Sequence, residues 1–293
     1  MASGDGGISS TEELLAELVA SLPGGGEARP GQAEMATLVA GSLRDRRRMA
    51  VRAGTGTGKS LAVLAAIAGT GVRTVVATAT KALQDQYADK ELPHLVEHIP
   101  ITWAVLKGRS NYLCLERLAE ARSVLAGEPT AAAQEELFES ASKTTPDAEL
   151  PEDFENGFSA IEDWAEETEA GDLSELPFEV DRRTAPWVST GPEGCPGAAL
   201  CPHGEDCFAE KAIARAREAD VVLVNTALLG ADLALDGALL GGADAYVIDE
   251  AHEAEDILGG AFGAEVRGDD LLRVERNLRV ATSEAGDVRE ELR

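Results

Sequence analysis

Residues 53–60 of this chain, AGTGTGKS, constrain its fold more than any other segment. They match the phosphate-binding loop pattern, in which a small residue is followed by four residues and then by Gly-Lys-Ser. Glycines let backbone N–H groups curl around phosphate oxygens, and the helix that follows presents its positive N-terminal end. Such a loop needs an apolar strand before it and a helix after it. The segment therefore predicts an α/β fold.

Each position of this loop has an expected role in holding phosphates. Lys59 is expected to reach the outer phosphates, and the Ser60 hydroxyl to ligate Mg²⁺. The alternative is an ordinary glycine-rich turn. The context favours the phosphate loop, because a short apolar strand is expected at 49–52 and a helix at 59–68. The loop residues predicted to bind nucleotide and Mg²⁺ are Ala53, Gly54, Thr55, Gly56, Thr57, Gly58, Lys59 and Ser60.

A second nucleotide motif lies at residues 245–252, AYVIDEAH, where an apolar strand ends in Asp-Glu. Asp249 is expected to hold Mg²⁺, through water, and Glu250 to polarise the attacking water. His252 is a candidate for coupling the nucleotide to a DNA-contacting segment. The alternative for this segment is a helix N-terminus with acidic residues in its first turn. The upstream phosphate loop favours the nucleotide site.

Short apolar segments alternate with helical segments along much of the chain. Strands alternating with helices predict a mostly parallel sheet that is covered on both faces. The expected strands are 73–77, 101–106, 221–224 and 245–248. One helix is expected within the first 25 residues, stopped by Pro23, and the other expected helices are 31–43, 59–68, 81–87 and 209–218.

The four cysteines form a spaced set, with three of them in a loop rich in glycine and proline. In a reducing compartment, clustered thiols usually bind metal. Structural zinc normally uses pairs two to four residues apart, and the gaps of five here favour a larger [4Fe–4S] cluster. Zinc and four buried free thiols are the alternatives. The predicted ligands are Cys114, Cys195, Cys201 and Cys207.

One region of the chain is much more acidic than the rest. The chain of 293 residues has 26 Lys and Arg against 53 Asp and Glu, a net charge of −27. Residues 128–179 contain 17 of the acidic residues and one basic residue, so we expect a solvated insertion there. The overall balance argues against non-specific coating of nucleic acid or membrane.

With no signal peptide and no long apolar run, the expected location is cytoplasmic.

Six segments, in order along the chain, resemble the iron–sulfur helicases of the DinG and XPD type in superfamily 2, and most closely the DinG branch. Residues 249–252 resemble the DEAH box of that family. The long cysteine gap followed by two short gaps is similar to the DinG spacing. The other resembling segments are RPGQ at 29–32, the phosphate loop at 53–60, TATKALQDQ at 78–86, KGRSNYLC at 107–114 and NTALL at 225–229.

The resemblance implies a RecA-like P-loop motor domain with an inserted iron–sulfur cluster domain. It implies that Arg29 and Gln32 read the adenine of ATP, and that Thr78 and Lys81 belong to a segment gripping the DNA backbone. Four more residues are candidates for DNA contact or for supporting the cluster, with ordinary surface or packing roles as the alternative. These residues are Lys107, Arg109, Asn111 and Tyr112.

The domain boundaries expected from this resemblance divide the chain into five parts. They are an N-terminal lead at 1–26, the first part of helicase domain 1 at 27–110, an iron–sulfur domain at 111–208 with its acidic insertion at 128–180, the second part of helicase domain 1 at 209–262, and the start of an arch-like insertion at 263–293.

The implied function is an ATP-dependent DNA helicase of 5′→3′ polarity that acts in DNA repair, on single strands and on forked or looped duplexes. The family's second motor domain, which supplies an arginine finger, is expected to be missing from this chain. We therefore expect weak ATP hydrolysis unless a second chain completes the site. The alternative is a non-catalytic, truncated or split module that binds nucleotide and DNA and carries the cluster.

Overall fold

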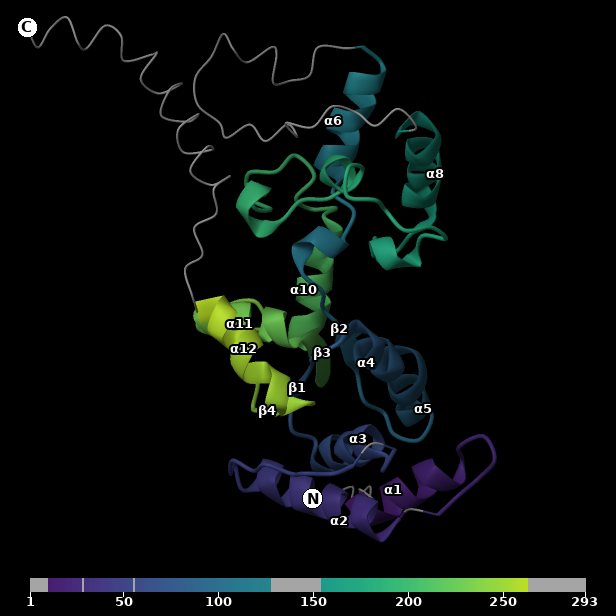
Figure 1. Cartoon of the computed structure of the whole chain (residues 1–293), viewed down its shortest axis with the longest axis vertical. Coiled ribbons are helices and arrows are strands. Elements are labelled where there is room, and N and C mark those ends of the chain that lie inside the picture. Colours follow the sequence, from purple (N-terminus) through teal and green to yellow (C-terminus); the bar gives the residue numbers. More distant parts are fainter. Residues whose placement is uncertain (1–9, 28, 55, 128–153, 263–293) are drawn as a thin grey trace, which may run out of the picture.

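A computed structural model describes residues 10–27, 29–54, 56–127 and 154–262 of the chain (Figure 1). Its centre is a four-stranded parallel sheet in the order β2-β3-β1-β4. This confirms the α/β class and the parallel sheet. The strands are β1 (Thr74–Thr78), β2 (Trp103–Val105), β3 (Val221–Asn225) and β4 (Ala245–Ile248).

Helices surround this sheet and extend the molecule at both ends (Figure 1). A π-helical segment, η1 (Tyr87–Glu91), joins α4 to α5. The α-helices are α1 (Thr11–Ala20), α2 (Pro30–Arg44), α3 (Lys59–Thr70), α4 (Lys81–Gln86), α5 (Leu92–Val96), α6 (Leu115–Leu125), α8 (Phe154–Glu167), α9 (Ala185–Val188), α10 (Phe208–Glu218), α11 (Thr226–Ala234) and α12 (Ala254–Phe262).

The two central strands are buried on both faces, as in other parallel sheets covered by helices. Side chains alternate along a strand, so neighbouring residues enter different cores. Val76 and Leu223 pack with α1, α2, α3 and α5, whereas Val75 and Val222 pack with α10 and α11. The apolar runs that predicted these strands are therefore explained by burial from both sides.

One expected strand did not form. Residues 49–52 lie in neither a helix nor a strand, and Met49 and Val51 are each 41% exposed. A short apolar segment becomes a strand only when a neighbouring strand pairs with it, and the described β-ladders leave this segment out. The expected strand at 101–106 is also shorter, at Trp103–Val105.

The region after β2 builds a smaller core of its own. Leu113 and Leu118 pack there with Ile161 and Val188, which brings α6, α8 and α9 together. Figure 1 shows α6 and α8 at the end of the molecule opposite α1 and α2. About half of the expected acidic insertion at 128–180, namely residues 128–153, and the expected arch start at 263–293 lie outside the described residues. None of the described helices combines the length and apolarity that crossing a bilayer requires.

Candidate functional site

The phosphate loop turns sharply into α3. Gly56 and Gly58 have φ values of 71° and 76°, a left-handed conformation that favours glycine. Gly58 is the N-cap of α3, so the helix N-terminus opens directly onto the loop. Thr57 Oγ1 donates a hydrogen bond of 2.9 Å to the carbonyl of Gly54 and closes the turn. Thr55 lies outside the described residues.

Two residues from the start of α2 fasten this loop from outside. Arg29 Nη1 donates to the Gly56 carbonyl at 2.7 Å, and Gln32 Nε2 donates to the Gly58 carbonyl at 3.1 Å. The contact with Gln32 is so close that a Cβ on Gly58 would lie 2.3 Å from Gln32 Nε2. The structure thus brings both of the residues expected to read adenine onto the phosphate loop.

The acidic motif meets the loop across the end of the sheet. The backbone N–H of Asp249 donates to the Ala77 carbonyl at 2.8 Å, which continues the pairing of β4 with β1. Glu250 has a φ of 52° and turns its side chain to Lys59, with 2.8 Å between Nζ and Oε1. In a parallel sheet the carboxyl ends of the strands meet at one edge, and this edge is the usual ligand position in open α/β folds.

His252 stands apart from this pair. Its side chain is 71% exposed, and its ring nitrogens lie 3.4 Å from Glu250 Oε2 and 3.8 Å from Glu253 Oε1. The histidine therefore lies at the rim of the site, beside the carboxylate that contacts Lys59.

Tyr87 and Glu91 also enter the site, and the sequence motifs did not identify them. Tyr87 OH donates to Asp249 Oδ2 at 3.3 Å, and Ser60 Oγ donates to Glu91 Oε1 at 2.6 Å. Both residues come from η1, where the Leu92 N–H bonds the Tyr87 carbonyl five residues earlier. Single π-turns of this kind are frequent at functional sites. The only local signal was a tyrosine followed four residues later by an acid.

Glu91 is held in a confined environment. Its Oε1 also accepts a 2.6 Å hydrogen bond from Gln86 Nε2, while its Oε2 is buried without a hydrogen-bond partner among the described residues. Burial raises the pKa of Glu91, and the hydrogen bonds from Ser60 and Gln86 oppose that rise. A buried carboxylate oxygen beside Ser60 and Asp249 is a suitable partner for a cation or its bound water.

The other titratable groups respond to the same neighbours. The hydrogen bond with Glu250 raises the pKa of Lys59, and the same bond lowers the pKa of Glu250. Burial raises the pKa of Tyr87 well above its ordinary value, and the negative charge of Asp249 adds to the rise. Tyr87 therefore remains a hydrogen-bond donor to Asp249 at neutral pH.

The four cysteines converge from distant parts of the chain. Cys114 is the N-cap of α6 and Cys207 is the N-cap of α10. Cys195 and Cys201 lie in the loop between α9 and α10. All four are half-buried and unpaired.

Hydrogen-bond donors surround the sulfur atoms. The Gly197 N–H donates to Cys195 Sγ at 3.4 Å, and Arg109 Nη1 approaches Cys207 Sγ at 3.8 Å. Burial raises the pKa of Cys114 and of Cys201. Among the described residues, no three of the four sulfurs lie within 4.8 Å of one another. Sulfurs around a tetrahedral zinc, with bonds of about 2.3 Å, would be roughly 3.8 Å apart.

Two of the cationic DNA candidates are engaged inside the protein. Lys107 Nζ lies 2.6 Å from Asp172 Oδ2 and 2.8 Å from Ser174 Oγ. Arg109 forms an ion pair with Glu210. Both cations are therefore neutralised by carboxylates, and Arg109 lies next to the cysteines.

The remaining DNA candidates differ in how exposed they are. Asn111 is exposed and donates to the Gly108 carbonyl, whereas Tyr112 is buried and its OH accepts from the Lys107 N–H at 3.1 Å. Thr78 is buried at the end of β1, and Lys81 begins α4.

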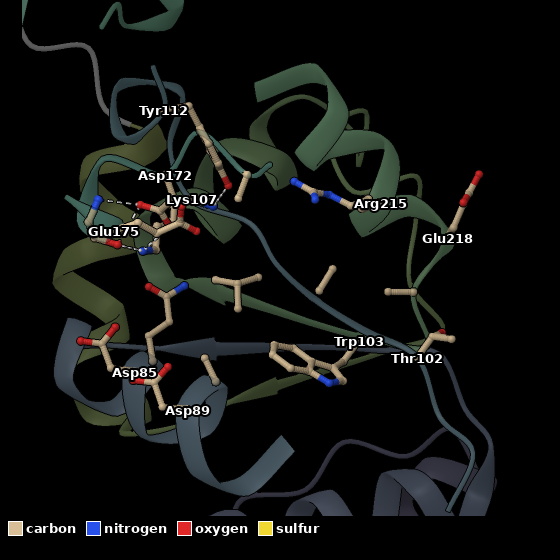
Figure 2. Close-up of a pocket in the computed structure, with 17 residues that line it drawn as sticks. Asp85, Asp89, Thr102, Trp103, Lys107, Tyr112, Asp172, Glu175, Arg215 and Glu218 are labelled. Carbon is tan, nitrogen blue, oxygen red and sulfur yellow. Dashed lines mark hydrogen bonds and ion pairs between the residues drawn. The ribbon is translucent and has the colours of Figure 1, made fainter. Parts of the chain in front are cut away.

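A cavity of about 920 Å³ opens beside β2, between α4 and α10 (Figure 2). Trp103 from β2 and Arg215 from α10 face into it, and Lys107 lines it with its ammonium held by Asp172. Its charged lining residues are mostly acidic, which disfavours a phosphate backbone in this cavity. The acidic lining residues are Asp85, Asp89, Asp172, Glu175 and Glu218.

Comparison with curated proteins finds several relatives, although no protein-family model matches the sequence. The chain is 40% identical over 271 residues to "ATP-dependent helicase DinG" of Mycobacterium tuberculosis strain H37Rv, across 88% of this chain and 39% of that protein. It is 33% identical to "ATP-dependent DNA helicase YoaA" of Escherichia coli K12, across 90% of this chain and 39% of that protein.

A more distant relative carries a different name. The chain is 27% identical to "3'-5' exonuclease DinG" of Bacillus subtilis strain 168, across 83% of this chain and 24% of that protein. The chain thus spans about two-fifths or less of the length of these curated relatives.

Proposed function

Since this chain is a homologue of the DinG and YoaA helicases, we propose that it is the first, N-terminal portion of an ATP-dependent DNA helicase of the DinG type. In this proposal the sheet and its helices form a RecA-like motor domain. The whole enzyme would couple ATP hydrolysis to 5′→3′ movement on single-stranded DNA and to the opening of forked or looped duplexes.

One observation carries the nucleotide part of the proposal. Lys59 and Glu250, 191 positions apart in the chain, meet at 2.8 Å where the phosphate loop faces the end of β4. Such convergence of a loop lysine with the acid after a strand is the arrangement that phosphoryl-transfer sites need.

Each residue of the site has a proposed role that follows from its chemistry. Lys59 would hold the outer phosphates together with the N-terminus of α3. Ser60 and Asp249 would hold Mg²⁺, which when bound neutralises phosphate charge. Glu250 would leave Lys59 when phosphate arrives and would orient the attacking water. Arg29 and Gln32 would bind the adenine while they support the loop.

Nucleotide binding tests this assignment directly. Fluorescent ADP with Mg²⁺ should bind the wild-type chain, and Lys59→Ala should weaken that binding about 10- to 100-fold, the equivalent of one charged hydrogen bond. Arg122→Ala, which removes an exposed cation on α6, is the control and should bind like the wild type. Equal affinity of Lys59→Ala and the wild type would overturn the assignment.

We further propose that Cys114, Cys195, Cys201 and Cys207 hold a [4Fe–4S] cluster in an inserted domain at 111–208. Three features support this: the four sulfurs converge, backbone and Arg109 donors approach them, and their spacing exceeds that of a zinc site. The cluster, when bound, would supply iron–sulfur bonds that tie α6, α10 and the loop together. Arg109 would support this site by balancing thiolate charge.

A second candidate function is suggested by the finding that the chain matches only about two-fifths of the length of its relatives. A nucleotide-binding and cluster-carrying module would need a partner chain, or further sequence, to supply the second motor domain. ATP hydrolysis by the isolated chain distinguishes the two. DNA-stimulated turnover supports a motor, whereas nucleotide binding without turnover supports the module.

A further inference from the structure

A histidine cluster lies on the side of α5 that faces α1. The segment His94-Leu95-Val96-Glu97-His98 ends α5 and continues into the following turn. Leu95 is fully buried in the core, and the positions three and four apart, 94, 97 and 98, share a face beside it. One ligand atom from each of these three residues lies within 4.8 Å of the others.

The two imidazoles are enclosed and close together. Each histidine side chain is only 15% exposed, and the ring centroids are 5.1 Å apart with the planes at 72°. The Glu97 carboxylate lies 3.8 Å from His94 Nδ1 and is otherwise exposed, so its side chain is able to turn toward a bound ion.

The C-terminal end of α1 orients both rings. His94 Nε2 lies 2.9 Å from the Leu18 carbonyl, and His98 Nδ1 lies 3.2 Å from Glu17 Oε1. A carbonyl or carboxylate oxygen only accepts, so each contact places a ring proton on that nitrogen. The other nitrogen of each ring then keeps its lone pair. Metal-binding histidines show this pattern, with the second nitrogen donating to a carbonyl or carboxylate.

We propose that His94, Glu97 and His98 bind a divalent transition-metal ion of the zinc class, with Glu17 and Leu18 holding the rings in place. Two imidazole nitrogens and a carboxylate oxygen are a common donor set for zinc. Ligands around zinc are about 3.4 Å apart, so the rings and Glu97 need to close by roughly an ångström. Ser21 Oγ lies 2.9 Å from His98 Nε2 and 3.2 Å from His94 Nε2, so an ion bound to His98 Nε2 must displace the serine hydroxyl from that nitrogen.

The ion would fasten α1 to the α/β core. The residues that bind it come from α5, while the residues that orient them, 17–21, come from the end of α1. Filling the site therefore links two segments that lie more than 70 positions apart in sequence. The expected role is structural, because side chains and α1 surround the ligands.

Cobalt binding by the whole chain tests the proposal. Because free thiols such as the four cysteines would also take up cobalt, the probe is Co²⁺ followed by its spectrum: thiolate ligands add a strong near-ultraviolet charge-transfer band that nitrogen and oxygen ligands lack. The wild type should bind one more equivalent of Co²⁺ than His98→Gln does. This additional Co²⁺ should add no thiolate charge-transfer band to the spectrum. Hydrogen exchange at residues 17–21 should slow with Co²⁺ in the wild type alone.

A surface variant keeps the test decisive if His98→Gln fails to fold. Glu97 is exposed, so Glu97→Gln should fold normally and weaken Co²⁺ affinity at least about tenfold. Glu34→Gln, an exposed glutamate of α2, is the matched control and should leave the affinity unchanged. Equal Co²⁺ binding by wild type, His98→Gln and Glu97→Gln would overturn the site and leave a hydrogen-bonded network only.

Discussion

Lys59, in the phosphate loop, forms an ion pair with the carboxylate of Glu250. Its ammonium and Glu250 are 23% and 28% exposed, so solvent screens the pair only partly. A nucleotide phosphate must compete with Glu250 for the same ammonium. Glu250, the acid that would orient the attacking water, therefore also lowers the affinity of the site for nucleotide.

Glu250→Gln isolates this competition. The amide keeps the size of the side chain and removes its charge, so Lys59 becomes free for phosphate. Because such pairs are worth about 1 kcal/mol or less, we expect Mg·ADP to bind up to about fivefold more tightly. Fluorescence titration against the wild type measures this. A loss of affinity in Glu250→Gln would contradict the proposed competition.

The same pair makes stability depend on pH. Lys59 lowers the pKa of Glu250, so the stabilisation is present at neutral pH and is lost as the pH falls through that lowered pKa. Glu250 raises the pKa of Lys59, so the same stabilisation is lost again only in strong alkali. The melting temperature of the wild type should exceed that of Glu250→Gln near pH 7, and the difference should shrink below about pH 4.

Glu91 is the residue through which Ser60 is positioned. Because Glu91 accepts the hydrogen bond that Ser60 donates, the lone pairs of the Ser60 hydroxyl stay free for a cation. Glu91→Gln should weaken the Mg²⁺-dependent part of nucleotide affinity by about tenfold and leave metal-free binding unchanged. Titrations of fluorescent ADP with and without Mg²⁺ separate the two parts. Glu34→Gln is the control, and an equal loss in both titrations would show a merely structural role.

Short motifs predicted Lys59 and Glu250 as site residues, and the structure brings these two side chains together. The motifs missed residues whose position depends on distant partners. Tyr87 and Glu91 required the π-turn that aims them at Asp249 and Ser60. The charge of Lys107 suggested DNA, but its partner Asp172 lies far along the chain. Ion pairs of this kind cannot be read from local pattern.

Among the elements, the entry into α3 depends on backbone conformation as much as on sequence motif. Gly58 combines a φ of 76° with the close approach of Gln32. Gly54, in the same loop, has open space around a Cβ, with Thr57 Cγ2 at 3.9 Å as its nearest neighbour. The two glycines therefore differ in what a methyl group would cost.

Gly58→Ala should destabilise the chain by about 1–3 kcal/mol, because a non-glycine residue is strained at this φ and must also displace Gln32. Gly54→Ala should change stability by less than about 0.5 kcal/mol. Urea denaturation of both variants measures the difference. Similar losses in the two variants would contradict this account of the loop.

Elements with strong local signals were predicted well. β1 and β3 are apolar along their whole length because helices cover both faces, and this burial leaves a continuous run in the sequence. The segment 49–52 has a similar but shorter run, and it stays unpaired in the described structure. Strand formation depends on a partner, which a single segment does not reveal.

Across the whole molecule, the cysteines lie at the boundary between two cores. Cys114 is the N-cap of α6, which packs in the smaller core, while Cys207 is the N-cap of α10, which packs against the sheet. The sequence predicted the set of four but not the Arg109–Glu210 ion pair beside it, because these residues are 101 positions apart. A cluster at this junction would hold the insertion at a fixed angle to the sheet.

Metal content tests this junction. Protein purified without oxygen should be brown and contain about four irons per chain, and Cys201→Ser should lose most of them. Because a cluster would join α6 to α10, the same variant should be cleaved faster by protease in the loop between α9 and α10, while the sheet stays protected. His203→Gln is the matched control: this histidine shares the loop but faces Glu116 at 3.5 Å, so its iron content should be unchanged. Colourless protein with one zinc per chain would replace the cluster with a zinc site, whose sulfurs would have to move closer together.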